Sequence, residues 1–204
     1  MIRSPTSAGA LRPRRLPHLR LLLPILGFAA TAGRAEVQIE RLTLPHHAAP
    51  SSFAIGLPGG INFCFDPVRG SVNYVWTGAF LDVAPARPGT GKFIGPAILL
   101  GPVVYREAGP APLRRGSASR IAPTRFPGYT LRPEAVEFRY TVDGVLVRET
   151  ILRSADGGRL IRRLQIEEPG SRWWRVIEGQ EPAELQRDTT GTAVIELLLP
   201  AAGS

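Results

Sequence analysis

Two aromatic segments are the parts of this sequence best suited to bind a ligand. The ten residues from Tyr74 to Val83 hold three aromatic side chains and the carboxylate of Asp82. Trp173 and Trp174 are adjacent, so on a strand they point to opposite faces and one of them should reach solvent. Exposed aromatic rings beside a carboxylate suit a sugar, because the rings stack on its apolar face while the acid bonds its hydroxyls.

We therefore predict a ligand-binding site that includes Trp76, Asp82, Tyr129, Trp173 and Trp174. The alternative for Trp76 is burial, since it shares a strand face with Tyr74 and aromatic side chains placed in this way are more often core. A sugar-active enzyme is a second alternative, with Asp82 and Glu149 in acid and base roles.

Motifs of known enzymes are incomplete in this sequence. Residues 89–93 approach the pattern of a phosphate-binding loop, but its first glycine would fall on Ala86, and Phe93 replaces the hydroxyl that Mg²⁺ needs. Beyond residue 35 the only histidines are His46 and His47, in a proline-flanked segment, so a serine or cysteine triad lacks a suitable base. Adjacent histidines alone do not make a structural zinc site, which takes four spaced ligands. We expect no metal and no resident cofactor, and we favour a non-catalytic protein.

The first 35 residues have the three parts of a secretory signal peptide. Arginines precede an apolar run of about a dozen residues that starts at Leu21, and small residues follow at Ala30, Ala32 and Ala35. The run is short of the about 20 residues that span a bilayer, although an uncleaved N-terminal anchor is the alternative. We expect a periplasmic or extracellular protein with a signal peptide over 1–35, one β-rich domain over 36–204 and no transmembrane segment in the mature chain.

Most of the net positive charge of the chain lies in this predicted signal peptide. The formal net charge is +8, but six of the 25 basic residues lie in the first 35 residues, which leaves 19 basic against 17 acidic residues. A nucleic-acid-binding protein needs its basic surface in the mature part, so we expect no nucleic-acid partner. The expected partners are a carbohydrate or an envelope protein.

Short apolar runs separated by glycine and proline fill the rest of the chain. With 22 glycines and 20 prolines, about ten such runs predict an antiparallel β-sandwich or barrel-like sheet pair with long Pro/Gly-rich loops. We expect loops over 84–96 and 108–125, and little helix, with one short helix over 181–187. The single cysteine, Cys64, lies between two phenylalanines on a predicted strand, so we expect a buried and inert thiol.

The clearest local structure is a hairpin over residues 136–152. Asp143-Gly144 separates two alternating runs, which predicts a two-residue type I′ turn. This turn fixes the register: Tyr140 faces Val147 and Phe138 faces Glu149 on an apolar side that must be covered. On the other, wet side, Arg139 lies opposite Arg148, with Glu137 diagonal to Arg148. A second hairpin is expected at Asp156-Gly157-Gly158.

Three segments follow one another along the chain: Phe65-Asp66-Pro67 with the run from Tyr74 to Val83, then Phe126-Pro127-Gly128-Tyr129-Thr130-Leu131, then the hairpin from Phe138 to Glu149. In this order they resemble the β-rich domain of large secreted bacterial proteins described as c-type cytochromes or membrane-bound dehydrogenases. The resemblance covers about residues 53–166 and implies an envelope β-domain, with a role beside a periplasmic redox system as an alternative. The chain departs from the family because it has no haem-attachment motif.

Overall fold

The computed structural model describes residues 36–87 and 95–199, and all of them belong to one compact unit, Arg34–Ser204. The signal peptide expected over residues 1–35 lies outside the described residues. The described chain is all-β and antiparallel, as the sequence predicts, and forms four sheets without a closed barrel. It contains one short 3-10 helix, η1 (Ala84–Ala86).

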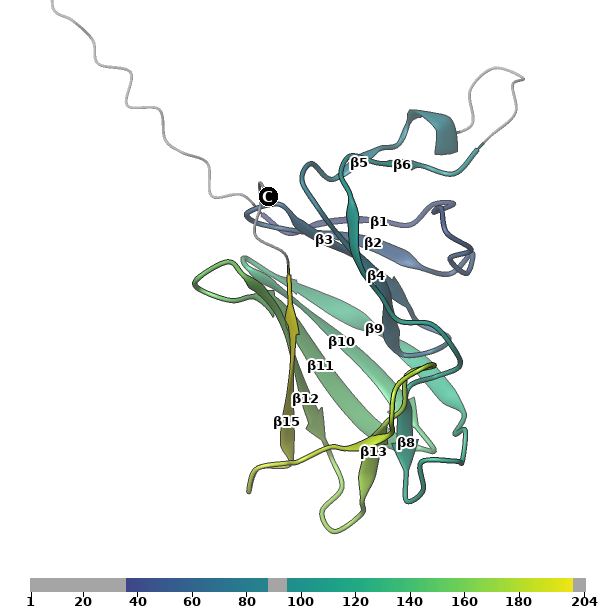
Figure 1. Ribbon diagram of the computed structural model, residues 1–204, viewed down its shortest axis with the longest axis vertical. Helices are drawn as coiled ribbons and strands as arrows, with labels where there is room; N and C mark the ends of the chain where they lie inside the picture. The colour runs from purple at the N-terminus through teal and green to yellow at the C-terminus, as the bar shows by residue number, and fades with distance from the viewer. Residues whose placement is uncertain (1–35, 88–94, 200–204) are drawn as a thin grey trace, which may run out of the picture. The chain divides into compact units, whose positions relative to one another are not determined.

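Two five-stranded sheets make up most of the fold (Figure 1). The first sheet has the order β1 (Gln38–Glu40), β2 (Phe53–Leu57), β3 (Ile61–Asp66), β4 (Ser71–Thr77) and β7 (Val103–Arg106). The second sheet has the order β15 (Thr192–Leu198), β12 (Arg159–Ile166), β11 (Val145–Arg153), β10 (Ala135–Val142) and β9 (Thr124–Arg132).

Two smaller sheets complete the fold. The third sheet has the order β14 (Ala183–Glu184), β13 (Trp173–Arg175) and β8 (Leu113–Arg115). The fourth pairs β5 (Leu81–Asp82) with β6 (Ile98–Leu99). The third sheet joins chain segments that are about 60 residues apart, since Trp174 of β13 pairs with Arg114 of β8.

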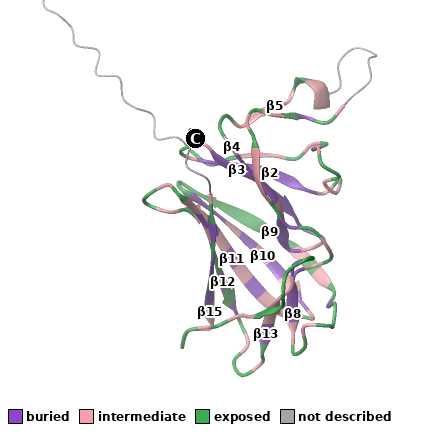
Figure 2. Cartoon of the chain, viewed as in Figure 1, coloured by how far each residue is buried: buried purple, intermediate pink, exposed green. Residues whose placement is uncertain are grey.

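The main core lies between the two large sheets. Phe65 of β3 stacks on Phe138 of β10 with ring centroids 3.7 Å apart, so the sheets face each other across their aromatic side chains. Leu113 and Trp173 of the third sheet belong to the same core. Figure 2 shows this burial on both large sheets, whereas the edge strand β9 is largely exposed.

The first sheet is buried on its second face as well. Cys64, Tyr74 and Trp76 point away from the main core into a smaller cluster, where Leu44 and Ala97 cover them. Every residue of β2 and β3 is therefore buried. In the second sheet, by contrast, buried residues alternate with partly exposed or exposed residues along β10 and β12.

The predicted hairpin is confirmed residue by residue. Tyr140 pairs with Val147, Phe138 with Glu149, and Arg139 with Arg148. Asp143 and Gly144 have φ angles of 54° and 82°, as a type I′ turn requires. The second predicted hairpin is also present, because β11 pairs with β12 across residues 154–158.

Two local predictions are wrong. Residues 181–187 do not form a helix: Ala183 and Glu184 instead extend the third sheet, where Glu184 pairs with Trp174. Residues 108–125 are not a plain surface loop, because β8 lies within them and buries Leu113 and Arg114. In both cases the segment is a strand because it pairs with another strand that is distant in sequence. Local propensity does not predict such a pairing.

The turn residue Asp143 also fastens the hairpin to the segment before β9. Arg120 donates to both of its carboxylate oxygens, at 2.8 and 2.9 Å, and Arg115 donates to it at 3.2 Å. The hydrogen bonds from Arg120, followed by those from Arg115, lower the pKa of Asp143 below its ordinary value of 3.8.

This lowered pKa predicts an acid-side effect on stability. A carboxyl group whose pKa is lower in the folded than in the unfolded protein stabilises the fold above its ordinary pKa, and that contribution is lost as pH falls through the folded-state pKa. We expect Asp143→Asn to lower the urea midpoint at pH 7 and to lower it less at pH 3. An equal difference at both pH values would show that the turn, not the ion pairs, is affected.

Candidate functional site

The predicted aromatic site is not assembled in the structure. Trp76 and Trp173 are both 0 % exposed, so neither ring is available to a ligand. Trp76 lies in the smaller cluster, where its indole Nε1 donates to the carbonyl oxygen of Phe80 at 2.9 Å and its ring stacks on the Phe80 ring. Trp173 lies in the main core.

The other three predicted residues lie at the surface but are engaged with their neighbours. The half-buried Trp174 has the Arg172 guanidinium 4.9 Å from its ring centroid. The Tyr129 ring packs against Phe53 at 5.4 Å, and a carboxylate oxygen of Asp82 accepts a hydrogen bond from the backbone of its own turn. The five residues belong to four different sheets, so the structure does not bring them together on one surface.

The alternative acid, Glu149, is 0 % exposed and belongs to a buried network of charged groups. It accepts hydrogen bonds from Arg162 Nε at 2.5 Å and from the Tyr140 hydroxyl at 2.7 Å. Asp82 lies on another sheet, so the two carboxylates do not form a pair around a shared cleft. A substrate has no access to Glu149, which argues against the acid–base role considered for it.

The same network links three sheets through Glu107, which follows β7. One carboxylate oxygen, Oε2, accepts hydrogen bonds from Arg162 of β12, Arg175 of β13 and the Tyr105 hydroxyl, at 3.2, 3.0 and 2.9 Å. Burial by itself lowers the pKa of Arg162, but Glu149 and Glu107 outweigh it and raise that pKa. Burial, followed by the charge of Glu107, raises the pKa of Tyr105 to about 12. The network therefore holds the sheets together at neutral pH.

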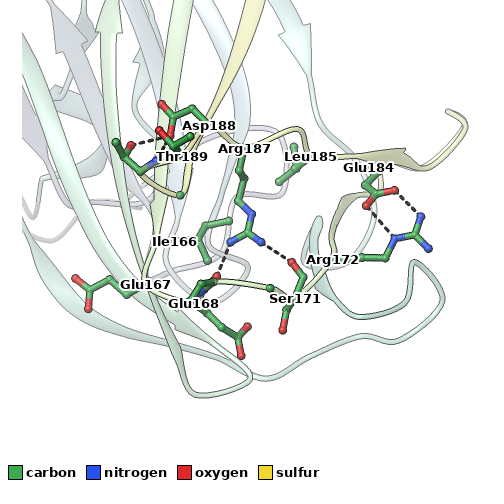
Figure 3. A pocket seen from close by; sticks show the side chains of 14 residues that line it. Ile166, Glu167, Glu168, Ser171, Arg172, Glu184, Leu185, Arg187, Asp188 and Thr189 are labelled. Carbon is green, nitrogen blue, oxygen red and sulfur yellow. Dashed lines mark hydrogen bonds and ion pairs between the residues drawn. The ribbon is translucent and has the colours of Figure 1, made fainter.

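A polar pocket of about 480 Å³ lies between the loop after β12 and the loop before β15 (Figure 3). Arg187 crosses it and donates to the backbone carbonyls of Glu168 and Ser171 at 2.6 and 2.5 Å. At its rim, Arg172 binds the Glu184 carboxylate through two nitrogens. Its charged groups already bind one another, the backbone or arginines outside the pocket, such as Arg148 and Arg115, so these contacts hold the two loops together.

Cys64, on β3 of the first sheet, is buried as the sequence predicts. Burial raises the pKa of its thiol to about 11. Because the thiolate is the reactive form, we expect Cys64 to react with a thiol-specific disulfide reagent at pH 8 at least about 100-fold more slowly in the folded protein than in guanidinium. Rapid labelling of the folded protein would show that the first sheet opens.

An apolar groove of about 540 Å³ lies on the outer side of the first sheet. Its walls include Pro45, His46, Ala97, Ile98, Val103 and Arg106. We call it the His46 groove. Ile98 and the neighbouring Leu100 are 51 % and 45 % exposed, so apolar surface continues from the groove onto the edge of the fourth sheet. The groove is bounded by β7, which is an edge strand of the first sheet.

The polar end of the His46 groove is formed by two side chains. Arg106 donates to Nδ1 of His46 at 3.2 Å and lies over the Tyr74 ring at 5.9 Å. Desolvation of the ring, followed by the charge of Arg106, lowers the pKa of His46, so the ring is neutral at pH 7 and accepts this hydrogen bond. Arg106 forms no ion pair with an acid in residues 36–87 and 95–199, and its charge is therefore open to a ligand.

The backbone at this groove is strained. His46 and His47 have φ angles of 60° and 59°, in the left-handed region that costs a non-glycine residue about 1 kcal/mol or more. Such strain persists where surrounding contacts impose it, and it concentrates at functional sites. The histidine pair stood out in the sequence, but its partner Arg106 did not, because 60 residues separate them.

Comparison of the chain with protein-family models, with curated proteins and with solved structures finds no match. In residues 36–87 and 95–199 there is no group of three or more His, Cys, Asp or Glu side chains placed to hold a metal ion. In the same ranges no helix has the length and apolar character needed to cross a membrane. The resemblance to the cytochrome-associated β-domain stays a prediction.

Proposed function

We propose that this protein is an exported, non-catalytic binding module, and that its His46 groove receives an extended apolar segment of an envelope protein. The observation that carries the proposal is that Arg106, which forms no ion pair among the described residues, lines an apolar groove beside His46. Ligand sites are typically concave and apolar, with a few polar groups that fix the orientation of the ligand. The occupant should therefore carry apolar side chains and one carboxylate that meets Arg106.

An extended peptide fits this groove better than a compact small molecule. Among the described residues β7 pairs only with β4, so its other edge presents backbone donors and acceptors beside the groove. A peptide strand can add to such an edge, with backbone hydrogen bonds giving affinity and side-chain pockets giving specificity. The exposed Ile98 lies where alternate side chains of the peptide would pack.

Selection from a random peptide library displayed on phage tests the proposal. We expect enriched peptides to combine apolar residues with an acidic residue, and Arg106→Glu to weaken their binding about tenfold or more, the effect of losing a charge-assisted hydrogen bond. Arg163→Glu, an equal charge change on the second sheet, should leave binding unchanged. Failure to enrich any sequence, or equal losses in both variants, would overturn the proposal.

Photo-crosslinking tests where the selected peptide binds without changing the charge of Arg106. A photo-reactive amino acid at Ile98 should capture the selected peptide, whereas the same group at Val194 should not. The two positions are matched, since their side chains are 51 % and 53 % exposed, but Val194 lies on β15 of the second sheet. Capture at Val194 alone would move the binding site away from the groove.

A further inference from the structure

The outer face of the second sheet carries a row of arginines that the His46 groove does not use. Arg139, Arg148 and Arg163 come from the neighbouring strands β10, β11 and β12, and their side chains point away from the main core. We call these three residues, together with Arg125 of β9, the arginine face. Strands in a sheet lie about 4.8 Å apart, so these cations are close neighbours.

The strand register places like charges against each other. Arg139 pairs directly with Arg148, and Arg163 lies one strand further, opposite Thr150. Like charges directly opposite on neighbouring strands are destabilising. Gly128 opposes Arg139 on its other side, and a Cβ there would lie only 3.9 Å from Nη2 of Arg139. The guanidinium of Arg139 therefore extends over β9, away from Arg148.

The acids near this face are already paired. Arg148 binds Glu167 at 2.9 Å, while Glu137 and Glu196 bind Arg132 and Arg159, each at 2.7 Å. Within the described ranges Arg125, Arg139 and Arg163 form no ion pair. The buried Nε of Arg139 also has no hydrogen-bond partner there. An excess of positive charge therefore remains on a face that no acid of the described residues neutralises.

We propose that the arginine face binds an acidic polysaccharide whose sugars carry carboxylates. A chain with regularly repeated anions can meet several guanidinium groups at once, and it can neutralise the arginines that no acid in the described ranges pairs. Among the outward residues between the arginines, Thr141, Thr150 and Gln165 can bond sugar hydroxyls. Leu146 and Glu137 lie on the same face, and Glu137 is already paired with Arg132. The outward residues of β10, β11 and β12 include no aromatic side chain, which disfavours the base stacking that single-stranded nucleic acids use.

Isothermal titration of the purified protein with oligogalacturonate at low salt tests this proposal. We expect binding that weakens as salt is added, because exposed charges are screened. The double variant Arg139→Gln/Arg163→Gln should bind about tenfold more weakly or worse, since charged hydrogen bonds are lost. Arg87→Gln, which removes an exposed charge beside the fourth sheet, should bind as the parent protein does.

Two further measurements are needed to interpret a loss of binding: the thermal stability of the double variant and the binding of other ligands. The double variant should unfold at about the same temperature as the parent, because Arg139 and Arg163 form no ion pair within the described ranges, so a loss of binding cannot be assigned to unfolding. No binding of oligogalacturonate, equal binding by the double variant, or tighter binding of a single-stranded DNA of equal charge would each overturn the proposal. Arg106→Glu should leave oligogalacturonate binding intact, which separates this surface from the peptide groove.

Discussion

Replacement of Arg162 by methionine should destabilise the protein by about 3–5 kcal/mol, as measured by urea unfolding at pH 7. The Arg162 side chain is 1 % exposed and lies between Glu149 and Glu107, whose side chains are 0 % exposed. Methionine fills a similar volume but leaves the Glu149 carboxylate buried without a cation, and it leaves Glu107 with Arg175 as its only cation among the described residues. Removing one member of a buried ion network lowers the free energy of unfolding strongly, because a charge is left buried without its partner. Replacing the whole network by apolar residues has a much smaller effect.

The neighbouring residue supplies the control. Arg163→Met removes the same charge from the exposed side of β12, so its effect should stay within about 0.5 kcal/mol. The Arg162→Met penalty should shrink at lower pH, because buried carboxylates without a cation take up protons more readily. Adding Glu149→Gln to Arg162→Met should recover part of the loss. A small penalty that does not depend on pH would contradict the role given to this network.

Replacement of Trp173 by alanine should cost about 3–5 kcal/mol, the usual effect of removing a large aromatic side chain from a core. Trp173 is 0 % exposed and brings the third sheet into the main core. Its indole N–H has no hydrogen-bond partner among the described residues. Trp173→Phe, which keeps an aromatic ring and removes that N–H, should therefore cost less than Trp173→Ala.

The adjacent indole gives a matched comparison. Trp174→Ala removes the same side chain from the partly exposed side of β13 and should cost less than about 1 kcal/mol in guanidinium unfolding. Intrinsic fluorescence separates the two further, because Trp173 should emit at shorter wavelength than Trp174 in the folded protein. Equal losses of stability from both substitutions would mean that the third sheet is not anchored through Trp173.

The sequence was most informative where neighbouring residues decide the structure. Asp143 and Gly144 both require positive φ, so the turn type and then every pairing between β10 and β11 follow from those two positions. The alternation around this turn also placed Arg139 opposite Arg148 on the exposed face. The all-β fold follows from the same kind of local signal, repeated along the chain.

The sequence was least informative where distant segments meet. Glu107, Arg162 and Arg175 come from three sheets, and nothing in the spacing of these residues indicates that one carboxylate oxygen meets both arginines. The aromatic segment around Trp76 was a plausible binding surface, but Leu44 and Ala97 pack over it in the structure. Exposure of an aromatic ring depends on what packs over it, and a strand pattern shows only which rings share a face.

The late position of β15 in the chain has a consequence for the kinetics of folding. β15 completes the second sheet beside β12, although residues 167–191 separate the two strands, and its residues Ile195 and Leu197 enter the main core. β8 likewise cannot pair until β13, about 60 residues further along the chain, has been synthesised. A chain made only as far as residue 190 would expose apolar surface and open strand edges. Folding should therefore follow synthesis of nearly the whole domain and take milliseconds to seconds, as in other domains dominated by non-local strand pairing.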